Sequence, residues 1–229
     1  MIPTMSRRKV VTASLVAGAI AIVAQSVAHL IATVEFGVCD ASGFGPCSSV
    51  FDLDHNNGIS DVVSSFVIAV AGIGAAVLGT RRRPREVMAF VLAAFLFLIS
   101  FDDTLHLEDT VRNAYGVFVF GTIVTAGVLL VRVAASVSSE TRRLMLFGVA
   151  ILALDIKFPF VYDQMMNVVG QPNLVRGDLL YELGVVLDEA MELAGWTLLA
   201  VGLWDAALSI RPADAVLPDR ARPGVGMTR

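Results

Sequence analysis

Residues 62–109 have the sequence VVSSFVIAVAGIGAAVLGTRRRPREVMAFVLAAFLFLISFDDTLHLED. Two long apolar runs flank a basic turn, and the second run ends in acidic residues and one histidine. A helix needs about 20 apolar residues to cross the roughly 30 Å of hydrocarbon in a bilayer. This stretch therefore predicts two transmembrane helices joined by a short basic loop.

The same pattern extends through the whole chain. Of its 229 residues 56% are hydrophobic and only 17% are charged, whereas soluble domains carry about 25% charged residues. The mean hydropathy is +0.74. Six apolar segments are long enough to span a membrane, at residues 10–34, 59–78, 87–105, 115–133, 144–162 and 180–208. We predict an all-α integral membrane protein with one six-helix domain over residues 1–210 and a flexible cytoplasmic tail over residues 211–229.

Two of these segments need comment. Asp155 and Lys157 interrupt the fifth, and Pro159 is expected to kink or end it. The first follows Arg7-Arg8-Lys9, as the apolar core of a signal peptide would. The apolar core of a signal peptide is about 7–15 residues long, and the apolar segment at residues 10–34 is longer. We therefore expect the first segment to be retained as a helix.

Charge orients the predicted bundle. With an inside N-terminus, 14 of the 17 basic residues fall on the inner side, and only Arg112, Lys157 and Arg176 fall on the outer side. The positive-inside rule then predicts an inner-membrane protein with both termini cytoplasmic. By contrast, 16 of the 21 acidic residues fall in outer loops or outer helix halves. The net charge of −4 argues against a nucleic-acid partner.

The first outer loop holds Cys39 and Cys47, the only two cysteines. Cysteines in an oxidising compartment usually pair, so we expect a disulfide in preference to a soft-metal site, which two thiols would leave incomplete. The loop then resembles the first half of an EF-hand-type calcium loop, through the oxygen-bearing residues Asp52, Asp54, Asn56 and Asp61. It has no Glu at the twelfth position, and a capped turn before the second helix is the favoured alternative.

Ionisable side chains inside the predicted spans mark a candidate site. Such groups are costly in a membrane and are functional-site hypotheses by default. In the third span Asp102, Asp103 and His106 share one helix face, and Asp103-x-x-His106 has the spacing that helical di-metal bundles use. In the sixth span the acids Glu182, Asp188, Glu189 and Glu192 share a face.

Asp155 on the fifth span and His29 on the first fall at a similar depth, so four helices contribute to one predicted outward-facing pocket. Simpler interpretations remain open. His29 could hydrogen-bond a neighbouring helix, Asp155 could form an ion pair with a basic residue, and Glu182 could be a solvated helix end.

Carboxylates with one or two histidines suit a divalent metal such as iron, manganese or zinc. We expect Asp103, His106, Glu189 and Glu192 to be ligands, with Asp155, Asp188, His29 and Asp102 as ligands or their hydrogen-bonding partners. Haem bound through His29 and His106 is disfavoured, because so many carboxylates are unusual beside haem.

Three function classes fit this pattern. The first is metal-dependent chemistry on a lipid-soluble or extracytoplasmic substrate, although the sequence leaves open whether the chain is an enzyme. The second is proton- or cation-coupled transport. The third is a subunit of a larger membrane complex or of a homo-oligomer, because the Gly/Ala-rich first two spans would pack closely with neighbours.

Overall fold

The computed structural model describes residues 7–36, 59–82, 86–105, 115–156 and 179–210, together with 158, 162, 164 and 166. Within these ranges it leaves the side chains of 7–8, 32–36, 59, 102–105 and 115–120 undescribed. Over this part of the chain every regular secondary-structure element is an α-helix, and there is no strand. The helices are α1 (Arg7–Phe36), α2 (Ile59–Arg81), α3 (Val87–Leu105), α4 (Tyr115–Ala135), α5 (Ser139–Asp155) and α7 (Leu179–Ser209). The prediction of an all-α chain is confirmed over these ranges.

Most helix boundaries agree with the apolar segments, but α5 does not. It begins before the predicted residue 144 because Ser138 caps it: the Ser138 side chain accepts a hydrogen bond from the Thr141 backbone N–H. It ends at Asp155 instead of residue 162. Pro159 has no N–H to bond the Asp155 carbonyl four residues earlier, so the helical ladder loses a bond at this point.

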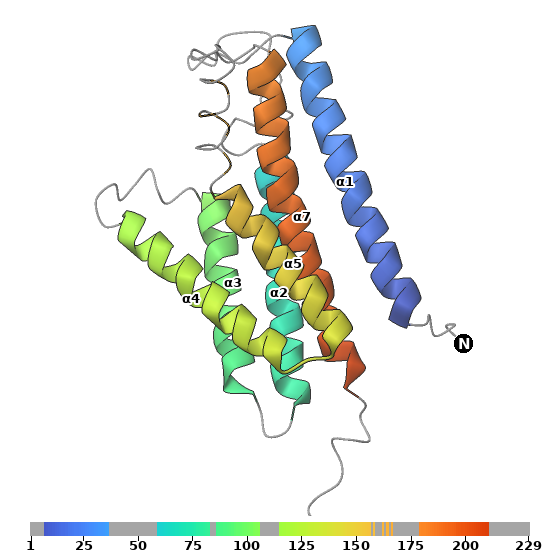
Figure 1. Ribbon diagram of the computed structural model, residues 1–229, viewed down its shortest axis with the longest axis vertical. Helices are drawn as coiled ribbons and strands as arrows, with labels where there is room; N and C mark the ends of the chain where they lie inside the picture. The colour runs from blue at the N-terminus through green and yellow to red at the C-terminus, as the bar shows by residue number, and fades with distance from the viewer. Residues whose placement is uncertain are drawn as a thin grey trace, which may run out of the picture.

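The helices run alternately in opposite directions, so α1 begins and α7 ends at the same end of the bundle (Figure 1). The long helix α7 packs against α1, α2 and α5, while α3 packs on α2, and α4 contacts α3 and α5. All described Lys and Arg side chains lie at the end where α1 begins, which we call the basic end: Lys9, Arg81, Arg82, Arg132, Arg142 and Arg143. We call the opposite end the acidic end.

The core lies where α2, α3, α5 and α7 meet, around Ile68, Leu96, Met145 and Leu203, which are at most 1% exposed. Large hydrophobic side chains are also exposed on all six helices; Ile20 on α1 is 63% exposed and Phe66 on α2 is 68% exposed. Soluble monomers rarely expose apolar surface on this scale. An apolar exterior around an apolar core is what a lipid-facing bundle requires.

Glycines set the closest helix contacts. A Cβ added at Gly195 of α7 would lie 2.5 Å from Leu152 Cγ of α5, and one added at Gly148 of α5 would lie 2.9 Å from the Gly195 carbonyl oxygen. On the other side of α7, a Cβ at Gly18 of α1 would lie 2.6 Å from Thr197 Cγ2. The absence of side chains at these positions lets α5 and α1 approach α7 closely.

By length and apolar content, two of the described helices could cross a membrane: Lys9–Ile31 within α1 and Ser60–Arg81 within α2. Two shorter apolar stretches lie at Val87–Phe101 and Gly121–Ala135. A signal sequence or the core helix of a soluble protein can pass the same criteria. The six-span topology and the cytoplasmic termini therefore remain predictions.

Candidate functional site

Five carboxylates from three helices come together toward the acidic end of the bundle. Asp61 lies in the first turn of α2, Asp155 is the last residue of α5, and Asp188, Glu189 and Glu192 lie on α7. Because α7 begins beyond the start of α2 (Figure 1), the first turn of α2 lies beside an inner part of α7 and not beside its first turn. We call these five residues the carboxylate cluster.

Glu189 is central to the cluster, since it interacts electrostatically with Asp61, Asp155, Asp188 and Glu192. All five residues are half-buried. Repulsion between such groups is stronger than in water, because the surrounding protein screens charge poorly. The arrangement therefore needs protons, hydrogen-bond donors or a cation to compensate the negative charge.

Some of that compensation is visible in hydrogen bonds. The Trp196 indole Nε1 donates to Glu192 Oε1 at 3.2 Å, and Ser60 Oγ donates to Asp61 Oδ1 at 3.3 Å. These donors are neutral and leave the net charge unchanged. Among the described side chains, Lys and Arg lie at the basic end and none lies beside the cluster.

Asp155 and Asp188 interact electrostatically across the α5–α7 contact. Two neighbouring carboxyl groups repel each other when both are ionised, and a proton on one of them would relieve that repulsion. Asp155 Oδ1 is buried and has no hydrogen-bond partner within the described part of the chain. That oxygen is an available acceptor or ligand at the edge of the cluster.

His29 makes a separate contact. Its Nε2 lies 2.7 Å from Glu182 Oε2, and the two residues are 1% and 3% exposed. Glu182 precedes Glu189 by seven residues, so it lies on the same face of α7, two turns nearer the acidic end. The interpretation of Glu182 as a solvated helix end is wrong, because α1 packs over it. The sequence indicates that Glu182 shares a helix face with Glu189, but it does not show which helix covers Glu182.

A second buried acid lies at the basic end. Thr141 Oγ1 on α5 donates to Asp205 Oδ2 on α7 at 2.5 Å, and Asp205 is 5% exposed. Ser138 Oγ lies 2.8 Å from the same Thr141 hydroxyl. The predicted topology places Asp205 among the few acidic residues on the inner side. Its position within an apolar helix was the available signal that it is buried and hydrogen-bonded.

Several predicted site residues cannot be placed. The backbone of Asp102 and Asp103 forms the last turn of α3, without described side chains. The ligand candidate His106, the Cys39–Cys47 disulfide, three of the calcium-loop residues (Asp52, Asp54 and Asn56) and the tail at residues 211–229 lie outside the described residues. Asp61, the fourth calcium-loop candidate, is a helical residue of the carboxylate cluster. No three His, Cys, Asp or Glu side chains that the structure describes are arranged to hold a metal ion.

Comparison with known proteins adds no assignment: the chain matches no protein-family model, no curated protein and no solved structure.

Proposed function

We propose that the chain is a six-span membrane protein with both termini in the cytoplasm, and that the carboxylate cluster is a cation-binding pocket opening toward the outer side. The observation that carries the proposal is the convergence of Glu189 with four other carboxylates from α2, α5 and α7. Half-buried acids in an apolar bundle must be protonated, paired, hydrated or bound to a cation. The Lys and Arg side chains that the structure describes lie at the opposite, basic end of the bundle.

Apolar side chains exposed on all six helices support the membrane placement, because lipid is the solvent that such a surface suits. Retention of α1 is supported by its contacts: a cleaved signal peptide would not need the buried His29–Glu182 contact or the close approach of Gly18 to Thr197. The separation of basic and acidic ends supports the orientation, with the basic end cytoplasmic.

We propose a divalent metal, iron, manganese or zinc, as the cation. Glu189 and Glu192 would bind it from α7, and Asp103 in the last turn of α3 would complete the ligand set together with His106, which follows this helix in the sequence. Asp155 with its buried Oδ1, Asp188 and Asp61 would supply further oxygen ligands or hold the ligands in place. This donor set of oxygens and one imidazole suits such metals, which could polarise a substrate entering from the bilayer or the outer side.

A proton is the second candidate, and the electrostatic interaction between the Asp155 and Asp188 carboxylates favours it. A proton shared between carboxylates of α5 and α7 can be exchanged with the outer solution. Carboxylates within a membrane relay protons in this way in pumps and transporters. In this case the pocket would couple proton movement to transport.

Purified protein tests the pocket through Glu189→Gln, with Glu140→Gln as the matched control because Glu140 is exposed in the first turn of α5. Equilibrium dialysis against manganese, iron or zinc, followed by elemental analysis, should find metal bound to wild type and Glu140→Gln and lost in Glu189→Gln. If the cation is a proton, a pH-sensitive dye in liposomes should report proton flux with the same dependence. If metal binding and proton flux are both the same in Glu189→Gln as in wild type, the proposal is overturned.

A further inference from the structure

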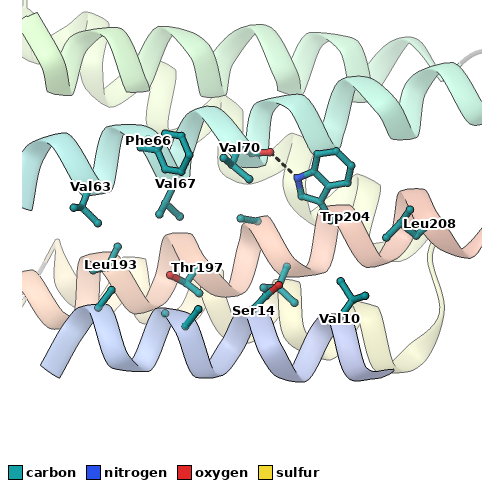
Figure 2. A pocket seen from close by; sticks show the side chains of 15 residues that line it. Val10, Ser14, Val63, Phe66, Val67, Val70, Leu193, Thr197, Trp204 and Leu208 are labelled. Carbon is teal, nitrogen blue, oxygen red and sulfur yellow. Dashed lines mark hydrogen bonds between the residues drawn. The ribbon is translucent and has the colours of Figure 1, made fainter. Parts of the chain in front are cut away.

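An apolar cavity of about 480 Å³ lies between α1, α2 and α7 (Figure 2). Its walls are α1 and α2 and its floor is α7. The lining is almost entirely aliphatic and aromatic, and its polar side chains are limited to the Ser14 and Thr197 hydroxyls and the Trp204 indole. Trp204 Nε1 is already engaged, since it donates to the Val70 carbonyl oxygen at 3.0 Å. We call this cavity the α1–α2 groove.

The groove exists because α1 is held against α7 and not against α2. Gly18 brings α1 close to Thr197 in the middle of α7, and His29 pairs with Glu182 farther along. On the α2 side of this contact, Phe66 remains 68% exposed. Ligand cavities typically measure about 300–1,000 Å³ and have mainly apolar walls, so the groove is large enough for a segment of an acyl chain.

Charge differs between the two ends of the groove. Val10 and Leu208 line one end, as Figure 2 shows. Lys9 precedes Val10 and is exposed, while Arg81 Nη1 lies 3.0 Å from the carbonyl oxygen of Ala207, the residue before Leu208. The other end is lined by Leu193, which follows Glu192 of the carboxylate cluster. An amphiphile with a negative head would therefore be favoured with its head at the basic end and its tail pointing toward the cluster.

We propose that the α1–α2 groove binds an acyl chain of an anionic phospholipid, whose phosphate is held at the basic end by Lys9 and Arg81. The proposal rests on the membrane placement put forward above. Basic pockets between transmembrane helices on the cytoplasmic side bind anionic headgroups. The lining of the groove carries no charged side chain, so it suits the lipid's acyl chain. A cationic or neutral headgroup would gain nothing from these two side chains.

The test uses Trp204 as a reporter within the groove. The chain has two tryptophans, so Trp196→Phe leaves Trp204 as the only indole fluorophore. The full-length protein is reconstituted in phosphatidylcholine bilayers that contain a small fraction of brominated phosphatidylglycerol or brominated phosphatidylcholine with the same acyl chains. We expect phosphatidylglycerol to be preferred at least about fivefold in quenching titrations, because each of the two basic contacts is worth about 1 kcal/mol, which corresponds to about fivefold.

Two variants locate the site. Lys9→Gln should reduce the preference for phosphatidylglycerol, whereas Arg132→Gln, an exposed cation at the basic end of α4, should leave it unchanged. Ala17→Phe, which fills the groove from α1, should reduce quenching by both lipids, whereas Val128→Phe on the exposed face of α4 should not. Equal quenching by the two brominated lipids would overturn the proposal. A preference for phosphatidylglycerol that is as large in Lys9→Gln as without this substitution would also overturn it.

Flotation of the same samples on a density gradient separates this inference from the proposed membrane placement. Protein that floats with the vesicles but shows no preferential quenching overturns only the lipid site. Protein that fails to float overturns the membrane placement and the lipid site together. Absence of quenching by both lipids in floating Trp196→Phe protein would also overturn the lipid site, because no acyl chain would then lie beside Trp204.

Discussion

At the scale of single residues, buried polar contacts join α7 to its neighbours at both ends of the bundle. His29 and Glu182 connect it to α1 at the acidic end, and Thr141 and Asp205 connect it to α5 at the basic end. Each contact has an exposed fraction of 5% or less for both residues. A polar group buried so deeply is costly when its partner is removed. These contacts therefore fix which helices are neighbours.

The His29–Glu182 contact gives a prediction about stability. Removing one partner leaves the other buried without it, so His29→Leu and Glu182→Leu should each lower the free energy of unfolding by about 3–5 kcal/mol. The double variant should cost less than the sum of the two, because it leaves neither partner behind. Denaturant titrations in detergent would measure these values. Strictly additive losses would show that the two side chains do not interact.

At the scale of helices, the α5–α7 contact depends on small residues. A Cβ at Gly148 would approach the Gly195 carbonyl oxygen, which cannot move aside as a flexible side chain could. A Cβ at Gly202 would lie 2.5 Å from Met145 Cγ in the core. Because Asp155 and Asp188 face each other across the same contact, the spacing of these helices also sets the geometry of the carboxylate cluster.

Alanine substitution tests this contact. Gly195→Ala should destabilise the protein by about 1–3 kcal/mol through overpacking and should weaken cation binding by spreading α5 from α7. Gly121→Ala on α4 is the control, because its added Cβ would meet nothing within 4 Å of the described structure. That control should be neutral or stabilising by up to about 1 kcal/mol through helix propensity. Thermal unfolding would compare the two, and equal transitions would contradict the close packing.

Helix positions were predictable from the sequence where a long apolar run ends in polar residues. The third apolar segment was predicted at 87–105 and α3 has those bounds. The start of α5 was not predictable in this way, because its first turn is polar and depends on the Ser138 cap. Apolar length identifies the buried part of a helix, while capping side chains decide where the helix begins.

The neighbours of the site residues were less predictable. The face shared by Asp188, Glu189 and Glu192 follows from helical periodicity alone. The place of Asp61 beside Glu189 depends on how far α2 is shifted along α7, and the burial of Glu182 depends on α1 crossing it. The position of Asp61 and the burial of Glu182 both result from side-chain packing between helices that are distant in sequence. The periodicity of one helix carries no information about such packing.

At the scale of the whole molecule, the separation of charge predicts the topology. The proposed topology predicts that a fluorescent protein fused after Arg229 fluoresces in cells, because this end of the chain would be cytoplasmic. An alkaline-phosphatase fusion should be active when placed in the 37–58 connection and inactive when placed in the 83–85 connection. Alkaline-phosphatase activity of the fusion at residues 83–85 would contradict this topology, because that connection would then lie on the outer side.

Infrared difference spectroscopy of the protein in bilayers tests the carboxylate cluster most directly. Spectra are taken between acidic and neutral solution, and between metal-free and metal-loaded protein. We predict that one component of the carboxyl-band change disappears in Glu189→Gln, is altered in Asp155→Asn and persists in the Glu140→Gln control. If the three variants each lose only the signal of one independent, water-exposed carboxylate, the cluster is not a shared cation site.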